Sequence, residues 1–199
     1  MNPLNEDSDK KKIIIEKYNS TSNFYDERYR KIQNEKYTIQ FKNTDFRYKT
    51  LLDAGCGTGL LFEYISNLKF ANLNREFRYI GLDISWKMLM QFYRKVKSSN
   101  YRVSRNLILG DIENLPFREA KFNLIFSITS LQNLQDLEKG LEELFRVGRE
   151  DTALKLSILR KQLKLEEVIT YLNSWTINLR IEILEELEDV IIQGNLKKN

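Results

Sequence analysis

The stretch that decides the fold is LLDAGCGTGLL, residues 51–61, in which an apolar run ends in three glycines at alternate positions, Gly55, Gly57 and Gly59. The chain has only 8 glycines in 199 residues, so three of them within five positions require a structural reason. Glycine tolerates unusual backbone angles and lets a ligand approach the main chain without meeting a Cβ atom. The cluster therefore predicts either a tight turn before a helix or a ligand-binding turn.

Alternating strands and helices are predicted around this turn. Short apolar runs predict strands at 50–54, 77–84, 102–109, 122–128 and 152–160, and two more around a charged turn within 176–196. Helical spacing of apolar residues predicts helices at 60–70, 85–96, 134–147 and 163–172. This alternation predicts an α/β fold: a three-layer, doubly wound sheet of seven strands, mostly parallel and covered on both faces, with the terminal hairpin adding one antiparallel strand.

The segment before the first strand has a different character. Residues 11–41 place aromatic and aliphatic side chains among charges, which predicts one or two amphipathic helices broken near residues 19–22. The first ten residues are polar and are expected to be loose. We expect an N-terminal helical lid, residues 1–48, that is mobile and not needed to complete the sheet, followed by a binding domain, residues 49–199.

Composition excludes several kinds of site. The chain has no histidine, so an imidazole base, a Ser-His-Asp triad and histidine metal sites are excluded. Its single cysteine, Cys56, allows no internal disulfide, and no metal site is expected. No apolar run is long enough for a signal peptide or a membrane span, so a cytoplasmic protein without a membrane partner is expected. The net charge of +4 is weak evidence for a nucleic-acid partner.

The glycine spacing distinguishes between nucleotide-binding turns. Dinucleotide enzymes use G-x-G-x-x-G, in which the third glycine comes three residues after the second. Here it comes two residues after the second, and Leu60 occupies the position where that pattern requires glycine. No Gly-Lys-Ser/Thr follows, which excludes a phosphate-binding P-loop. A nicotinamide-dependent oxidoreductase is therefore disfavoured.

The segment DAGCGTG, residues 53–59, resembles the first motif of the class I S-adenosylmethionine-dependent methyltransferases. Three later segments resemble further motifs of that family: YIGLDIS at 79–85, GDIENLPF at 110–117 and KFNLIFSITSLQNLQD at 121–136. The chain is most similar to the methyltransferase type 11 subgroup, which includes quinone methyltransferases and small archaeal members. The resemblance implies a Rossmann-like methyltransferase fold with strand order 3-2-1-4-5-7-6 and S-adenosylmethionine as the cofactor.

The resemblance also implies roles for individual residues. Asp83 would accept hydrogen bonds from both ribose hydroxyls, Asp111 would accept from the adenine amino group, and Asp53 would lie beside the ammonium of the methionine end. Each aspartate could instead be a turn residue or a helix cap. The remaining residues expected to contact the cofactor come from the glycine turn, the positions after the two carboxylates, the lid and the fourth strand: Tyr18, Gly55, Cys56, Gly57, Gly59, Ile84, Ile112 and Ser127. The thiol of Cys56 is expected to pack within the turn rather than react.

The acceptor side is expected in the loop after the fourth strand. Gln132 and Asn133 would position a polar acceptor, or else cap the next helix. Tyr18 and Tyr25 would close over the methionine end as part of a lid, or else dock their helix on the sheet. Quinone-type relatives often carry histidine in this loop, and its absence here makes a phenol acceptor doubtful.

The function expected from this resemblance is transfer of a methyl group from S-adenosylmethionine to an unidentified acceptor. A small molecule is favoured over RNA or a protein as the acceptor. The alternative is a non-catalytic protein of the same fold that binds the cofactor or a partner.

Overall fold

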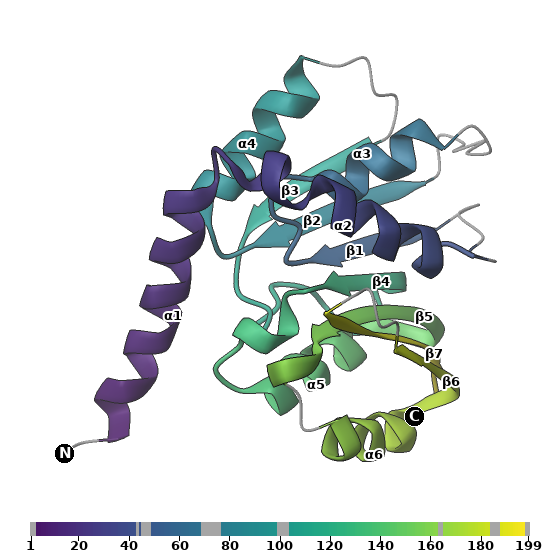
Figure 1. Ribbon diagram of the computed structural model, residues 1–199. Coiled ribbons are helices and arrows are strands. Elements are labelled where there is room, and N and C mark those ends of the chain that lie inside the picture. Colours follow the sequence, from purple (N-terminus) through teal and green to yellow (C-terminus); the bar gives the residue numbers. More distant parts are fainter. Residues whose placement is uncertain are drawn as a thin grey trace.

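The computed structural model describes residues 3–42, 44, 49–68, 77–98, 104–162, 165–183 and 188–197, and these form a layered α/β domain around one sheet (Figure 1). The sheet has seven strands in the order β3-β2-β1-β4-β5-β7-β6, which confirms the expected topology. β7 pairs antiparallel with β5 and β6, and the other pairings are parallel. The strands are β1 (Thr50–Ala54), β2 (Arg78–Asp83), β3 (Ser104–Leu109), β4 (Phe122–Ile128), β5 (Gly148–Leu159), β6 (Thr176–Ile183) and β7 (Asp189–Leu196).

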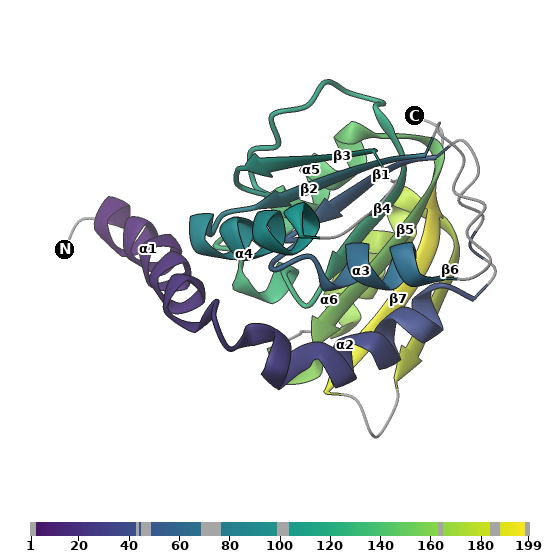
Figure 2. The same ribbon diagram turned by 90° about the horizontal axis from the view of Figure 1, so that it is seen from above.

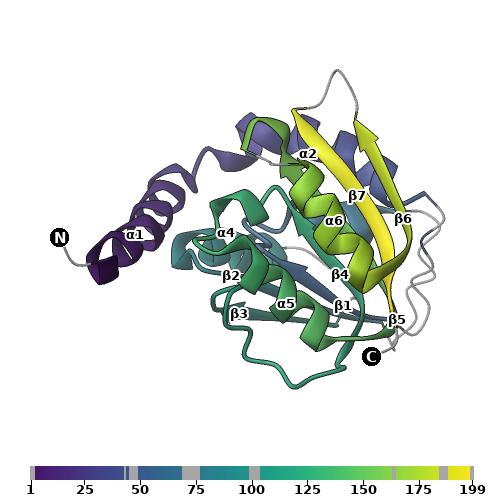
Figure 3. The same ribbon diagram turned by 90° about the horizontal axis from the view of Figure 1, so that it is seen from below.

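Helices cover both faces of the sheet. One face carries α2 (Tyr25–Gln40), α3 (Leu60–Asn67) and α4 (Trp86–Lys97), as Figure 2 shows from above. The opposite face carries α5 (Leu137–Val147) and α6 (Leu165–Trp175), which lie in front of the sheet in Figure 3. Each layer encloses its own cluster of buried apolar side chains, so the sheet separates two hydrophobic cores.

Local sequence fixes where two of these helices begin. Ser85 caps α4 as expected, because its hydroxyl accepts a hydrogen bond from the Met88 amide. The helix expected at Leu134 starts later, at Leu137, because residues Leu131–Asn133 form a 3₁₀ turn and Asp136 provides the cap. The loop between β4 and α5 is therefore longer and more tightly turned than the apolar pattern indicated.

The N-terminal segment consists of two helices that break at residues 22–24, close to the expected position. The first, α1 (Pro3–Thr21), begins within the ten residues that were expected to be loose. Proline suits a first helical turn because its fixed φ angle is already helical. The end of α1 is anchored on α4: the Asn19 side-chain oxygen accepts hydrogen bonds from the Ser85 hydroxyl at 2.8 Å and the Lys87 amide at 3.2 Å.

The second helix, α2, is built into the core. Tyr37 is buried in the same cluster as α3 and α4, and the Phe41 ring stacks on Phe126 of β4 at a centroid distance of 5.2 Å. The Gln40 amide donates to the Leu156 carbonyl at 2.7 Å. α2 thus packs as a layer of the fold. We therefore propose that a mobile lid is restricted to α1.

A buried ion pair also holds α2 to the sheet. Lys36 of α2 lies 2.8 Å from the Asp189 carboxylate of β7, and the two side chains are 3% and 1% exposed. We predict that Lys36→Met lowers the free energy of unfolding by about 3–5 kcal/mol, because it leaves a buried carboxylate without its counter-ion. The exposed Lys31 on the same helix is the matched control, and Lys31→Met should change stability by less than about 0.5 kcal/mol. Urea denaturation measures both, and equal stability of the two variants would contradict the assignment of α2 to the core.

Candidate functional site

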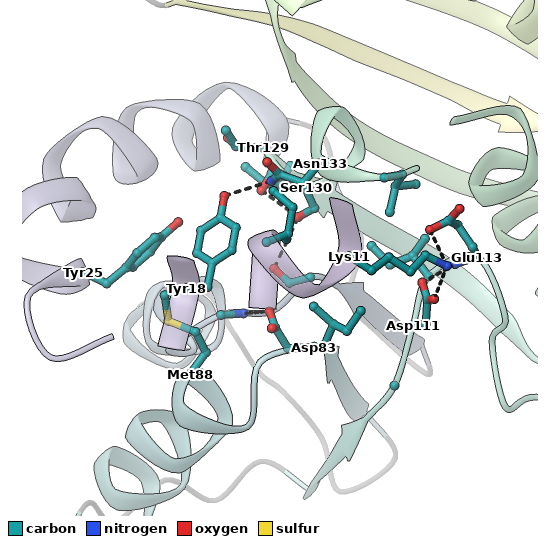
Figure 4. Close-up of a pocket in the computed structure, with 18 residues that line it drawn as sticks. Lys11, Tyr18, Tyr25, Asp83, Met88, Asp111, Glu113, Thr129, Ser130 and Asn133 are labelled. Atoms are coloured by element: carbon teal, nitrogen blue, oxygen red, sulfur yellow. Dashed lines mark hydrogen bonds and ion pairs between the residues drawn. The ribbon is translucent and has the colours of Figure 1, made fainter. Parts of the chain in front are cut away.

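A pocket lies at the sheet edge where β1, β2, β3 and β4 end (Figure 4). Helix α1, whose course Figure 1 shows, closes one side of it. In a doubly wound sheet this edge, at the point where strand order reverses, is where ligands bind. The pocket is lined by backbone and side chains from α1, the start of α2, the glycine turn, α4 and the loops after β2, β3 and β4: Lys11, Ile14, Tyr18, Tyr25, Gly55, Gly57, Asp83, Ile84, Met88, Gly110, Asp111, Ile112, Glu113, Ile128, Thr129, Ser130, Asn133 and Leu134.

The glycine turn forms the floor of this pocket. Gly55, Gly57 and Gly59 all have positive φ angles, of 84°, 54° and 82°. A Cβ atom on Gly55 would collide with the Ser130 side chain, whereas one on Gly57 would meet no atom within 4 Å. The space beside Gly57 is therefore open and belongs to the pocket. Gly59 lies outside the lining, since a Cβ there would collide with the Phe92 ring in the core.

Asp83 lies at the end of β2 and faces the pocket. Its Oδ2 accepts a hydrogen bond from the Gly57 amide at 2.8 Å, and its Oδ1 accepts from the Ser85 amide at 2.8 Å. Burial nevertheless raises the pKa of Asp83 to about 6, against the opposing effect of these backbone donors. The carboxylate is thus pre-oriented, ionised at neutral pH and able to accept further hydrogen bonds from the pocket side.

A second acidic group follows β3. Lys11 of α1 lies 2.7 Å from Asp111 Oδ2 and 2.9 Å from Glu113 Oε2, as the dashed lines in Figure 4 show. Desolvation lowers the pKa of Lys11, but the hydrogen bonds and charges of the two carboxylates outweigh it and raise that pKa overall. Glu113 also accepts from the Asp136 amide at 2.9 Å, so it holds the start of α5 in place. This cluster ties α1 to the pocket rim.

Aromatic and polar side chains form the remaining wall. The Asn133 amide donates to the Tyr18 hydroxyl oxygen at 2.9 Å, and the Tyr18 and Tyr25 rings are tilted against each other at 6.5 Å. Burial raises the pKa of both tyrosines, so both stay protonated at neutral pH. Because the Tyr18 oxygen accepts from Asn133, its O–H can donate to a bound molecule. This wall can position a polar acceptor but is poorly suited to deprotonate it.

Asp53 lies behind the pocket rather than in it. Its carboxylate accepts a short hydrogen bond from the Tyr79 hydroxyl within the core, and burial raises its pKa to about 7. Cys56 is also outside the lining, and its buried thiol packs close to Gly81, as expected for a packing residue. The structure thus places Asp53, Cys56 and Gly59, which were expected to contact the cofactor, outside the pocket lining.

Two residues expected after β4 are displaced in a similar way. Ser127 is fully buried and does not line the pocket. The Gln132 side chain donates to the Thr129 carbonyl at 2.7 Å instead of facing the pocket, so it braces the loop from within. Of the two side chains expected to position an acceptor, the structure therefore places only Asn133 at the site. The expected residues Tyr18, Tyr25, Gly55, Gly57, Asp83, Ile84, Asp111 and Ile112 also line it.

Half of the lining was not expected from the sequence: Lys11, Ile14, Met88, Gly110, Glu113, Ile128, Thr129, Ser130 and Leu134. Thr129 and Ser130 fall inside the loop that was assigned to the acceptor, so the motif itself could have located them. Lys11 and Ile14 come from α1, whose packing against the strand ends no local pattern indicates.

Comparison with known proteins agrees with this geometry. Residues 52–154, just over half of the chain, match the family described as methyltransferase domain. The chain belongs to this family. The matched region runs from β1 into β5 and so includes the glycine turn, Asp83 and Asp111.

Curated relatives resemble this region. A malonyl-[acyl-carrier protein] O-methyltransferase of Hamiltonella defensa is 35% identical over 115 residues, which cover 58% of this chain and 40% of that protein. A demethylmenaquinone methyltransferase of Desulfitobacterium hafniense is 36% identical over 99 residues, covering 49% of this chain and 37% of that protein. The chain thus spans about 40% of the length of these relatives.

Solved structures share the whole fold. The magnesium protoporphyrin IX methyltransferase of Synechocystis, solved with bound SAM, superposes with a TM-score of 0.72 at 17% identity, covering 94% of this chain and 97% of that one. A SAM-dependent methyltransferase from Aquifex aeolicus gives a TM-score of 0.70 at 17% identity, covering 89% of this chain and 98% of that one. At such identity the likeness establishes the fold.

Two further findings concern the described part of the chain. No helix in it is long and apolar enough to cross a membrane. The described residues also contain no group of three or more histidine, cysteine, aspartate or glutamate side chains placed to hold a metal ion.

The glycines of the turn should respond differently to an added methyl group. We predict that Gly57→Ala lowers the free energy of unfolding by about 1–2 kcal/mol, the cost of a left-handed alanine with no steric clash. Gly59→Ala should cost about 2–5 kcal/mol, because overpacking against Phe92 adds to the same strain. Urea denaturation of both variants measures the difference, and a larger loss in Gly57→Ala would show that the space beside Gly57 is filled.

Proposed function

We propose that this protein transfers a methyl group from S-adenosylmethionine to a small acceptor molecule. The observation that carries the proposal is the pairing of the open glycine turn with Asp83, whose carboxylate binds the Gly57 amide at the pocket floor. Family membership supports the reaction class. The names of the relatives, which act on a malonyl-[acyl-carrier protein], a demethylmenaquinone and a magnesium protoporphyrin, support a small acceptor group.

The lining residues fit such a cofactor. Asp83 would accept hydrogen bonds from the ribose hydroxyls, and Asp111 would accept from the adenine amino group. Ile84 and Ile112 would enclose the adenine ring. The methionine part would use the open space beside Gly57, where no side chain intervenes. The structure gives no support to recognition of the ammonium by Asp53, because that carboxylate is buried in the core, where it accepts a hydrogen bond from the Tyr79 hydroxyl.

Pocket charge also favours this ligand. Three carboxylates, those of Asp83, Asp111 and Glu113, line the pocket together with a single ammonium group, that of Lys11. The excess of negative charge favours a ligand that carries a positive sulfonium and an ammonium group. When bound, S-adenosylmethionine supplies an already activated methyl group, so the chain has to align the acceptor and exclude water. Alignment alone can lower a barrier by about 7–11 kcal/mol.

The acceptor would be held by the wall that carries Tyr18, Tyr25 and Asn133. The hydroxyl of Tyr18 and the amide of Asn133 are donors that can orient an oxygen or nitrogen nucleophile without removing its proton. The test is a two-stage experiment: calorimetry with S-adenosylhomocysteine and, as a control, NAD, then turnover of labelled S-adenosylmethionine on a panel of small carboxylic acids, quinols, amines and RNA. Failure to bind S-adenosylhomocysteine would refute the proposal, and turnover on the panel would identify the acceptor.

Cofactor affinity should depend on the ionisation of Asp83. We predict that S-adenosylhomocysteine binds about tenfold more weakly at pH 5 than at pH 7, because the carboxylate with a pKa of about 6 loses its charge in this range. Asp83→Asn should weaken binding at pH 7 by about 1.5–3 kcal/mol and abolish this pH dependence. Asp53→Asn is the matched control, since Asp53 lies outside the pocket, and calorimetry should show its affinity nearly unchanged. Comparable losses in both variants would contradict the ribose assignment.

The mobility of α1 is the remaining prediction for this site. We expect S-adenosylhomocysteine to slow amide exchange in residues 10–21 by about tenfold or more, because α1 supplies Lys11, Ile14 and Tyr18 to the pocket wall. α6 serves as the internal control, because it lies on the opposite face of the sheet (Figure 3). Strong protection of α1 that is the same with and without the ligand would mean that α1 is a fixed wall and not a lid.

A further inference from the structure

Thr129, at the end of β4, has an unusual backbone conformation. Its φ angle is 58°, in the left-handed region that β-branched residues rarely adopt. The residue lines the pocket beside Ser130 and Asn133, on the side that carries Tyr18 and Tyr25. Strained residues of this kind persist only where the surroundings hold them in place, and they concentrate at functional sites. The contacts that hold Thr129 therefore bear on the function of the site.

Four side chains hold Thr129 from behind. Its amide donates to the Ser157 hydroxyl at 3.0 Å, and its own hydroxyl donates to Asp189 Oδ2 at 2.9 Å. The Lys36 ammonium donates to the Thr129 hydroxyl at 2.8 Å, and the Gln132 amide donates to the Thr129 carbonyl at 2.7 Å. The Ser157 hydroxyl also donates to Asp189 Oδ2, at 2.8 Å. Every polar group of Thr129 is thus engaged, and the ion pair of Lys36 and Asp189 lies at the centre of the network.

Burial of this ion pair carries a large desolvation penalty. Both side chains are almost fully buried, and desolvation lowers the pKa of Lys36 even though Asp189 opposes the effect. Apolar residues can often replace a buried pair without loss of stability, so such a pair is weak evidence for a stabilising role. Neither residue lines the pocket, but both bind the Thr129 hydroxyl, and Thr129 does line it.

We propose, on the basis of the methyltransferase function above, that Lys36 and Asp189 are positioning residues for methyl transfer. The pair holds Thr129 in its left-handed conformation and thereby fixes residues 128–133, which form the acceptor side of the pocket. The hydrogen bond from Asn133 to Tyr18 then fixes the Tyr18 side chain relative to this loop. Helix α2 and strand β7, which lie far apart in the sequence, together set the geometry of a loop that neither of them belongs to.

The first test separates positioning from stability. The double variant Lys36→Met/Asp189→Leu removes both charges, so it should unfold at a higher urea concentration than Lys36→Met alone. Amide exchange of residues 129–133 in the unliganded protein should nevertheless rise by about tenfold, whereas α6 should be unaffected. Lys31→Met, on the exposed face of α2, should match the wild type in both measurements. Wild-type exchange at 129–133 in the double variant would overturn the proposal.

The second test uses Thr129 itself and does not depend on the double variant folding. Thr129→Val keeps the shape but removes the hydroxyl that both charged residues bind, whereas Thr129→Ser keeps the hydroxyl. With the acceptor found by the panel, Thr129→Val should lower kcat by about tenfold or more while the affinity for S-adenosylhomocysteine stays within about twofold. Thr129→Ser should restore most of the rate. Equal rates for valine and serine would overturn the proposal.

Failure of the proposal and failure of the proposed function give different results. If the wild-type protein does not bind S-adenosylhomocysteine, the methyltransferase function fails and positioning for methyl transfer fails with it. If it binds the ligand and turns over, but the loop exchanges normally in the double variant, only the role of Lys36 and Asp189 is refuted.

Discussion

The carboxylate of Asp83 is the constraint on which the site depends. It joins the glycine turn after β1 to the start of α4, because it accepts from the Gly57 amide and from the Ser85 amide. The Leu82 carbonyl, one residue earlier, accepts from the amides of Gly55 and Cys56 at 2.8 and 3.0 Å. The end of β2 thus fixes the path of the neighbouring turn, which glycine favours at both Gly55 and Gly57 because their φ angles are positive, and which at Gly55 also leaves no room for a Cβ atom. The hydrogen bonds that shape the turn therefore also hold Gly57 and Asp83 at the pocket.

Ser85 links the Asp83 carboxylate to helices α4 and α1. Its amide donates to Asp83, and its hydroxyl both caps α4 and donates to Asn19 of α1. The position of α1 is therefore coupled to the Asp83 side of the pocket. At the other end of the pocket, Lys36 and Asp189 hold Thr129 in the loop after β4. One group of polar contacts thus holds the Asp83 side and a separate one holds the loop after β4.

The sequence predicted those parts that local chemistry determines. The positions of Gly57, Asp83 and Asp111 follow from the period of the strands and from the residues that end them, and the structure brings them together. The contributions of Lys11 and of the Lys36–Asp189 pair did not follow, because they join residues about 100 and 150 positions apart without any local signal. Asp53 lies outside the pocket for the converse reason. Its place in the motif was clear, but the alternation of side chains along β1 turns the Asp53 carboxylate to the core, toward Tyr79.

Asp111 and Glu113 bind Lys11 of α1 and also line the pocket, so the hydrogen-bonding capacity of Asp111 decides whether a cofactor and this helix can be bound at the same time. Asp111 receives Lys11 at one oxygen and the Glu113 amide at the other. A carboxylate offers about four lone-pair directions, so two remain for another donor such as an adenine amino group. Lys11 and an adenine amino group can therefore bind Asp111 together, and the helix need not leave for the ligand to be held. Binding would then add contacts to α1 instead of replacing them, and α1 should become more ordered as the pocket fills.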